Sequence, residues 1–230
     1  MLKVAGGPEE RDGAAVMAWW NGDGAAPVLA HEGEALLLVR AVDDGGLTDL
    51  VRRGQDDQAT TILCEVAGRL HAPRPSRPPP TLRPLGAWFR CLWPTAGREG
   101  GIFAQAAGAA RRMLAEPQDV AVLHGDLHHG NVLDFGSVGW LAIDPKGLIG
   151  ERGYDFANLV CNPWPEADDP DRFERRLCLV ASTAKVDPRR IRQWVLAYAG
   201  LSAAWTLESD MPADGPWRAL RIGEMAAAGL

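Results

Sequence analysis

A short polar cluster that begins at His124 contains the residues of this sequence best suited to catalysis. It reads His-Gly-Asp-Leu-His-His-Gly-Asn and includes Asp126 and Asn131. Two short apolar runs separate it from Asp144. A loop between strands can direct Asp126 and Asn131 into one cavity, and Asp144 can add a carboxylate at the end of the next strand. The cluster therefore provides one candidate base and two oxygen ligands.

Phosphoryl transfer requires this combination of groups. Mg²⁺ prefers hard oxygen ligands and keeps water and nucleotide phosphates in the rest of its octahedron. We expect Asp126 to accept or orient the proton of an attacking hydroxyl, while Asn131 and Asp144 hold Mg²⁺ against the phosphates. The motif therefore favours ATP-dependent phosphoryl transfer with Mg²⁺.

Two other interpretations of the cluster need weighing. His124, His128 and His129 invite a zinc site, but adjacent histidines point in different directions, and the nearby Asn and Asp favour a harder ion. Asp126 alone after a glycine is also typical of a turn. Because Asn131 and Asp144 occur nearby, a catalytic role for Asp126 is favoured over a role in a simple turn.

The elements that must position these residues follow from hydrophobic periodicity and from turn residues. The proline-rich stretch 73–84 is interpreted as a packed surface loop rather than as an interdomain linker, because its neighbours are apolar. After residue 152 the sequence is almost wholly helical in pattern. We expect strands over residues 2–5, 27–30, 35–39, 120–123, 132–133 and 140–143, and helices over 9–20, 57–70 and 101–115.

Composition restricts the functional classes. The 230 residues are 47% hydrophobic and 23% charged, which is ordinary for a globular protein. A net charge of -6 with a pI of about 5.4 provides no basic surface for nucleic acid and suits a cationic partner better. The four cysteines have no metal-finger spacing, and no apolar stretch is long enough to span a bilayer. We expect a cytoplasmic protein that binds neither nucleic acid nor membrane.

Three runs together resemble a known family. They are the eight-residue cluster at His124, the Ile-Asp-Pro that ends at Pro145, and the segment from Gly150 to Val160. The sequence resembles the aminoglycoside and hydroxyurea antibiotic resistance kinases, including the streptomycin 6-phosphotransferases. The cluster at His124 alone is shared by a wider group that includes choline, homoserine and fructosamine kinases. The segment from Gly150 to Val160 restricts the resemblance to the antibiotic resistance kinases. The run from Leu37 to Ala41 is similar to the family's hinge.

The resemblance implies a role for each residue of the nucleotide site. Asp126 would be the catalytic base, with Asn131 and Asp144 as Mg²⁺ ligands. Lys3 corresponds to the lysine that contacts the phosphates of ATP, and the backbone of Val39 and Ala41 would bond to adenine. Two further residues would support the catalytic loop, namely His124 and Asp155.

Two departures from the family pattern concern the N-terminal segment. The strands that carry a glycine-containing nucleotide lid precede the lysine in the family, whereas only two residues precede Lys3. The helix glutamate that pairs with this lysine is not evident, which leaves Glu9 or Glu10 as substitutes. We expect an N-terminally truncated relative, or a start internal to a longer product, with an uncovered strand edge at Lys3 that favours association.

The acceptor site is less clearly marked. Glu151, Trp164 and Glu166 are candidates for binding a cationic sugar, and helix-start carboxylates on a solvated face explain the two acidic residues equally well. The oligomeric state is left open by the sequence.

We therefore predict an α/β (α+β) protein-kinase-like two-lobed fold. A truncated N-terminal sheet lobe spans residues 1–39, and a mainly helical lobe spans residues 40–230. The expected activity is transfer of the ATP γ-phosphoryl group to a hydroxyl of a small molecule, either a streptomycin-like aminoglycoside or hydroxyurea. A nucleotide- or ligand-binding remnant without turnover and another metabolite kinase of this fold are the alternatives.

Overall fold

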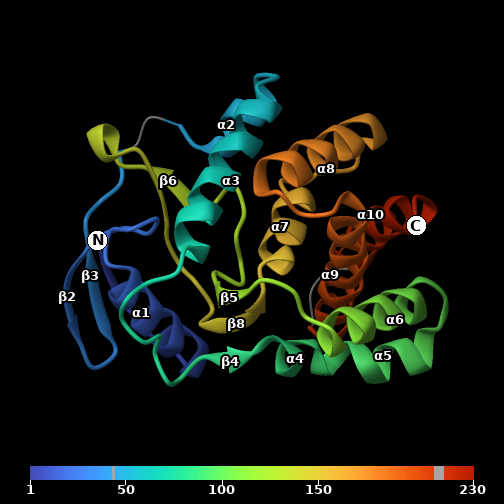
Figure 1. The fold of residues 1–230 in the computed structure, drawn as a ribbon, viewed down its shortest axis with the longest axis horizontal. Coiled ribbons are helices and arrows are strands. Elements are labelled where there is room, and N and C mark those ends of the chain that lie inside the picture. The colour runs from blue at the N-terminus through green and yellow to red at the C-terminus, as the bar shows by residue number, and fades with distance from the viewer. Residues whose placement is uncertain (43–44, 210–214) are drawn as a thin grey trace.

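The fold begins with a small sheet and one helix, shown in blue in Figure 1. The computed structural model describes residues 1–42, 45–209 and 215–230. The central strand of this sheet pairs antiparallel with both others, in the order β1-β3-β2. Within the described residues, β1 pairs only on one side, and its Leu2 and Val4 are exposed. The elements are β1 (Leu2–Val4), α1 (Pro8–Trp20), β2 (Val28–Glu32) and β3 (Ala35–Leu38).

Local sequence explains the limits of α1. Pro8 occupies the first turn, where its missing N–H would have no helical partner, and Glu9 and Glu10 place negative charge at the positive end of the helix. The helix ends at Asn21, which adopts a left-handed conformation with φ of 38°. The predicted helix over 9–20 is confirmed, as are the three strands that surround it.

The middle of the chain is mainly helical and leads into the strands that hold the catalytic loop. The prolines between α3 and β4 form an irregular surface connection, as predicted, but most of its residues are exposed rather than packed, and Arg74 ties it to Asp23. The elements are α2 (Leu47–Arg52), α3 (Asp56–His71), β4 (Arg83–Pro84), α4 (Leu85–Trp88), α5 (Leu92–Glu99), α6 (Gly101–Ala115), β5 (Val120–Leu123), β6 (Val132–Asp134), β7 (Trp140–Ala142) and β8 (Leu148–Glu151).

The two small sheets of this region frame the catalytic loop. β5 pairs antiparallel with β8, β4 pairs parallel with β8, and β6 and β7 form a hairpin. The loop between β5 and β6 therefore lies beside the segment between β7 and β8. The strand β8 was missed by the sequence analysis.

The C-terminal part is helical, as predicted. Its elements are α7 (Gly153–Val160), α8 (Pro170–Ala184), α9 (Pro188–Glu208) and α10 (Gly215–Ala228). Asp169 and Asp187 cap α8 and α9 by accepting hydrogen bonds from backbone amides in their first turns. In Figure 1 this red and orange group lies with α5 and α6 at the opposite side of the molecule from the N-terminal sheet. None of the described helices is long and apolar enough to cross a membrane.

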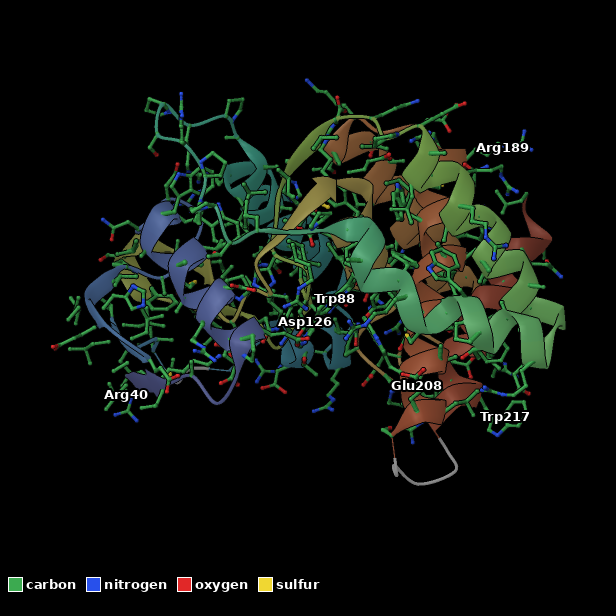
Figure 2. All side chains as sticks on the ribbon, turned by 90° about the horizontal axis from the view of Figure 1, so that it is seen from below. Arg40, Trp88, Asp126, Arg189, Glu208 and Trp217 are labelled. Atoms are coloured by element: carbon green, nitrogen blue, oxygen red, sulfur yellow. The ribbon has the colours of Figure 1, made fainter. Side chains whose placement is uncertain are left out.

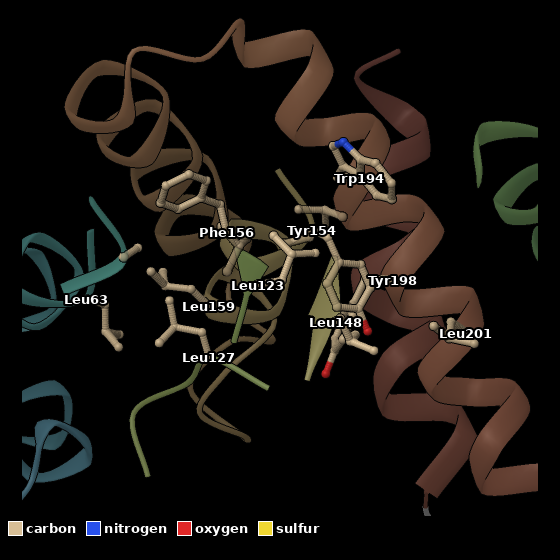
Figure 3. Close-up of a cluster of buried hydrophobic side chains, with 14 of the residues drawn as sticks. Leu63, Leu123, Leu127, Leu148, Tyr154, Phe156, Leu159, Trp194, Tyr198 and Leu201 are labelled. Carbon is tan, nitrogen blue, oxygen red and sulfur yellow. The ribbon is translucent and has the colours of Figure 1, made fainter. Parts of the chain in front are cut away.

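An apolar core joins α7 and α9 to the strands below the catalytic loop (Figure 3). The ring of Tyr154 contacts Phe89, Trp194 and Tyr198 edge to face, at centroid distances of 5.8, 6.1 and 5.7 Å. Leu123 and Leu148 of the paired strands are fully buried beside it. This packing holds the base of the loop on rigid elements.

The N-terminal sheet is joined to the catalytic strands through close backbone contacts. Ala26 donates a hydrogen bond to the carbonyl of Ala142, and Val42 donates to that of Asp134. A Cβ at Gly13 would lie 2.0 Å from the Pro145 carbonyl oxygen, so α1 packs directly on the residue after Asp144. The structure combines a small N-terminal sheet with a mainly helical remainder, which is the α+β arrangement that the sequence predicted.

Candidate functional site

Asp126 lies in the loop between β5 and β6, with its side chain 29% exposed. Its Oδ1 accepts a hydrogen bond from Asn158 at 3.2 Å, and its Oδ2 accepts one from Asn131 at 3.2 Å. The preceding Gly125 has a φ of 81°, and a Cβ there would lie 2.8 Å from Leu148. The loop conformation that presents Asp126 thus requires glycine at position 125.

The surroundings of Asp126 keep its carboxylate ionised. Burial raises the pKa of Asp126, but the nearby His128 and Lys146 and the hydrogen bond from Asn158 lower it by more, so the pKa of Asp126 lies below its ordinary value. Lys146 Nζ lies 3.4 Å from Oδ2. The carboxylate is therefore ready to accept a hydrogen bond from a substrate hydroxyl at neutral pH.

Asp155 holds the backbone of the loop from below. It is fully buried, and its two oxygens accept hydrogen bonds from the amides of His124 and Gly125 at 2.9 and 2.8 Å. His71 Nε2 lies 2.8 Å from the same carboxylate. This is the position that the supporting role predicted for Asp155 requires.

His124 is buried and bridges two strands of the site. Its Nε2 lies 2.7 Å from the carbonyl of Ile143, and its Nδ1 accepts the amide hydrogen of Asp126 at 3.2 Å. Burial lowers the pKa of His124 despite the nearby carboxylates. The neutral tautomer with hydrogen on Nε2 satisfies both contacts, so His124 braces the loop rather than exchanging protons with a substrate.

Asn131 and Asp144 are brought together by the β6–β7 hairpin. The amide of Ile143, the residue before Asp144, donates to the Asn131 carbonyl at 2.9 Å. The Asn131 side-chain Nδ2 donates to Asp126, which leaves its Oδ1 as the end available to a cation. An amide oxygen and a carboxylate are ligands that suit Mg²⁺. The donor set fits a magnesium ion, with Asn131 and Asp144 as the residues that would hold it.

Lys3 reaches this group from β1. Its Nζ lies 2.8 Å from Asp144 Oδ1, which places an ammonium group beside the proposed metal site. The substitutes expected to pair with this lysine do not do so. Glu9 forms an ion pair with Arg83 at 3.1 Å, and Glu10 accepts a hydrogen bond from the amide of Gly6.

Val39 and Ala41 lie directly after β3. The amide of Val39 donates to the carbonyl of Pro27, so this N–H is not available to adenine. Among the described residues, the carbonyl of Val39 and the amide of Ala41 have no backbone partner. One acceptor and one donor are thus left at the predicted adenine-binding position.

The three predicted acceptor residues do not line the cleft beside Asp126. Glu151 is 3% exposed, and its carboxylate accepts hydrogen bonds from Arg190, Trp194 and the Gln118 amide. Both oxygens are thus engaged in structural contacts, and the structure places Glu151 outside the cleft in which the sequence led us to expect it.

Trp164 and Glu166 belong to the segment between α7 and α8. The guanidinium of Arg218 lies 5.3 Å from the centre of the Trp164 ring, and Glu166 forms an ion pair with Arg52 at 3.2 Å. The structure does not bring either residue to Asp126. These contacts tie the segment between α7 and α8 to α10 and α2, away from the cleft beside Asp126.

The cleft that does open beside Asp126 has a volume of about 1020 Å³. Figure 2 shows Trp88 next to Asp126, with Glu208 farther along the same side. Sequence reasoning missed its walls, because the residues come from distant helices and carry no motif. The lining side chains with acidic, basic or aromatic character are Glu9, Glu10, Arg83, Trp88, Arg90, Asp126, Lys146, Tyr198, Trp205 and Glu208.

The histidines of the loop do not assemble a zinc site. The described residues contain no group of three or more His, Cys, Asp or Glu side chains arranged to hold a metal. His124 Nε2 faces a backbone carbonyl, His128 Nε2 lies 3.7 Å from Asp126, and His129 is buried at 2% exposure.

Buried His129 makes the fold sensitive to acid. Burial, with the charges of Arg176 and His128, lowers the pKa of His129 from 6.5 to about 3. Between these values the unfolded chain binds a proton that the folded chain does not, so the free energy of unfolding falls as pH is lowered. We expect urea unfolding to show a smaller fall between neutral pH and about pH 5 in His129→Leu than in the unchanged protein. An equal fall in both proteins would contradict this assignment.

Comparisons with known proteins identify similar sequences over most of the chain. A family model described as aminoglycoside/hydroxyurea antibiotic resistance kinase matches residues 1–210. The chain is 51% identical over 211 residues to a streptomycin 3''-kinase from Klebsiella pneumoniae, covering 89% of this chain and 79% of the relative. It is 31% identical over 224 residues to a streptomycin 6-kinase from Streptomyces griseus, covering 91% and 71%. A hydroxyurea phosphotransferase from Kitasatospora aureofaciens is 31% identical over 236 residues, covering 97% and 66%.

Solved structures with low identity share the fold. A choline/ethanolamine kinase family protein from Mesorhizobium loti superposes with a TM-score of 0.65 at 17% identity, covering 99% of this chain and 81% of that one. A thermostable mutant of aminoglycoside phosphotransferase APH(4)-Ia, solved with AMP-PNP and hygromycin B, has a TM-score of 0.66 at 17% identity, covering 99% and 86%.

Proposed function

Because this chain belongs to the aminoglycoside/hydroxyurea antibiotic resistance kinase family, we propose that it transfers the γ-phosphoryl group of ATP to a hydroxyl of a cationic, streptomycin-like aminoglycoside. The observation that carries this proposal is the placement of Asp126. Its ionised carboxylate lines a large cleft on one side and contacts Asn131, a metal-ligand candidate, on the other.

The transfer needs a base beside the attacking hydroxyl, with the attacking and leaving oxygens in line at the γ-phosphorus. Asp126 accepts the proton of the acceptor hydroxyl as the acceptor oxygen bonds to the γ-phosphorus and the bond to the β–γ bridging oxygen breaks. ADP leaves with that oxygen, and the phosphorylated acceptor remains. Asn131 and Asp144 would hold Mg²⁺, which neutralises charge on the phosphates when bound. Lys3 would add a second positive charge on the nucleotide side.

The cleft suits a cation with apolar faces. Glu10 and Glu208 contribute negative charge, whereas Glu9 is paired with Arg83. Trp88 and Trp205, which pack edge to face with ring centroids 5.6 Å apart, contribute aromatic surface. A cleft of about 1020 Å³ is larger than hydroxyurea needs, which favours an aminoglycoside over that second family substrate.

The sequence identities to streptomycin kinases favour one hydroxyl of streptomycin as the phosphoryl acceptor. The sequence resembles the streptomycin 6-phosphotransferases, but the chain is 51% identical to a 3''-kinase and 31% identical to a 6-kinase. We therefore propose the 3''-hydroxyl of streptomycin as the acceptor group. Nuclear magnetic resonance of the product would distinguish the two positions.

The experiment that tests the function measures Mg²⁺-dependent formation of ADP by the purified chain. The acceptors are streptomycin, other aminoglycosides and hydroxyurea, and Asp126→Ala is the inactive control. We expect turnover only with a cationic aminoglycoside. A folded protein that binds nucleotide but turns over no acceptor would refute the proposal in favour of a binding-only protein.

Glu208 supplies a test of acceptor recognition. A charged hydrogen bond to a cationic acceptor contributes on the order of 1.5 kcal/mol or more, so Glu208→Gln should raise KM for streptomycin about tenfold or more. KM for ATP should stay unchanged. Glu99→Gln, on α5 outside the cleft, is the matched control. An equal rise in both KM values would show that the substitution disturbs the fold instead.

A further inference from the structure

Lys146 is a cation in the cleft that the proposed mechanism has not yet used. It follows Asp144 and Pro145 in the connection between β7 and β8, and its side chain is 33% exposed. Its Nζ lies 3.4 Å from Asp126 Oδ2, and the residue lines the cleft beside that carboxylate. The ammonium group therefore faces the place where the acceptor hydroxyl meets the proposed base.

The backbone of this connection is fixed. The amide of Lys146 donates to the carbonyl of His124 at 2.7 Å. A Cβ at Gly125 would lie 3.0 Å from the Lys146 Cβ, and a Cβ at Gly147 would lie 2.6 Å from Asp12. The base of the lysine side chain is thus clamped between the catalytic loop and α1.

The contact with Asp126 leaves the ammonium group with unused donors. A tight charge-assisted hydrogen bond joins nitrogen and oxygen at about 2.7–2.9 Å, whereas this separation is 3.4 Å. Among the described residues, Asp126 is the sole carboxylate within ion-pair distance of Lys146, and Nζ makes no hydrogen bond. The N–H donors of Lys146 Nζ are therefore available to a second anion that binds near Asp126.

Composition sets Lys146 apart from the other cations. Lysine occurs at positions 3, 146 and 185, so 21 of the 24 cationic residues are arginine. Two of the three lysines contact the carboxylates of the site, Lys3 at Asp144 and Lys146 at Asp126. A compact ammonium group fits beside a small tetrahedral anion where a planar guanidinium needs more room.

We infer that Lys146 Nζ donates hydrogen bonds to an oxygen of the phosphoryl group while it passes from ATP to the acceptor, and this inference rests on the proposed function. Lys146 donates hydrogen bonds and transfers no proton in this step. As the bond from phosphorus to the acceptor oxygen forms, the hydroxyl proton passes to Asp126, and the bridging oxygen leaves with ADP. Asp126 becomes neutral, so its attraction for the ammonium falls when the phosphoryl group lies closest. The contact is stronger in the transition state than before it, which is the condition for raising kcat.

The test compares Lys146→Met and Lys146→Arg with Lys185→Met, a change at an exposed lysine at the end of α8. Lys146→Met should lower kcat about 10- to 100-fold, the loss expected for one charged hydrogen bond. KM for ATP and for streptomycin should change less than about twofold. Lys146→Arg should keep more activity than Lys146→Met, and Lys185→Met should match the unchanged protein.

A binding measurement separates contact with the phosphoryl group from support of Asp126. Calorimetry would titrate ADP into the streptomycin complex with Mg²⁺, with and without aluminium fluoride, which mimics the phosphoryl group in transit. Lys146→Met should bind ADP as the unchanged protein does but lose about 10-fold or more of the gain from aluminium fluoride.

Three results would overturn the inference. They are an undiminished kcat in Lys146→Met, an undiminished aluminium fluoride effect, or an equal loss of affinity for ADP with and without aluminium fluoride. If the Met variant does not fold, Lys146→Gln, which also removes the positive charge, decides in the same two assays. Absence of turnover by the unchanged protein would refute the proposed function itself, whereas an undiminished kcat in Lys146→Met would refute only the role of Lys146.

Discussion

Replacing Asp126 with alanine should lower kcat by about 10²- to 10⁴-fold, the usual contribution of a positioned general base. The variant removes the proton acceptor, while the loop keeps its own supports, since Asp155 still accepts the amides of His124 and Gly125. The fold should therefore survive. Formation of ADP with streptomycin measures the activity, and thermal unfolding measures the fold.

A second substitution separates the base from its contacts. Alanine also removes the oxygens that accept hydrogen bonds from Asn131 and Asn158, which could turn the Asn131 amide away from a metal ion. Asp126→Asn keeps the size and one acceptor oxygen but takes up no proton, so it should be inactive as well. Asp119→Asn is the control, because that carboxylate is 67% exposed and pairs with Arg152. If either Asp126 variant keeps a kcat within about tenfold of that of the unchanged protein, Asp126 is not the general base.

The catalytic loop could be predicted from the sequence because its chemistry is local. Asp126, Asn131 and Asp144 lie within 19 positions of one another, and the short strands between them leave few ways to arrange them. The helices over 57–70 and 101–115 were equally accessible, since their apolar residues recur at helical spacing. They correspond to α3 and α6 with limits that differ by at most one residue.

The acceptor site could not be predicted because long-range packing determines it. In the sequence, Glu151 is not distinguishable from any other carboxylate near the start of a helix. Its structural role depends on Arg190 and Trp194 of α9, which donate hydrogen bonds to it only in the folded protein. Conversely, Trp88 and Trp205 are 117 positions apart in sequence and meet at 5.6 Å. No spacing rule relates such residues before the helices pack.

The strand β8 was missed for a related reason. Its four residues, Leu148–Glu151, contain a glycine and a glutamate and have no alternating pattern. Pairing with β5 and β4 makes it a strand, and a Cβ at Gly150 would lie 2.6 Å from the Leu85 side chain. Tertiary contact outweighs local propensity here.

A buried ion pair joins α3 to α8 behind the catalytic loop. Asp56, at the start of α3, is 2% exposed, and Arg176 on α8 is fully buried. Arg176 Nε lies 3.1 and 3.0 Å from the two oxygens of Asp56, and its guanidinium also donates to the carbonyl of Asn162. The charge of Arg176 cannot be hydrated in the folded protein, and among the described residues Asp56 is its one carboxylate partner. Asp56 also lies 3.9 Å from Arg172 and from Arg175.

Asp56→Asn should therefore lower the free energy of unfolding by about 3–5 kcal/mol, because it leaves the Arg176 charge buried without its counterion. The neighbouring Asp57 provides a matched control, since its side chain is 62% exposed and pairs with the half-exposed Arg175 at 2.8 Å. Asp57→Asn should cost about 1 kcal/mol or less. The double variant Asp56→Leu with Arg176→Met should be more stable than Asp56→Asn, because it removes both charges and fills the space with apolar atoms. Urea unfolding measures all four proteins, and equal losses for Asp56→Asn and Asp57→Asn would show that the buried pair does not hold α3 and α8 together.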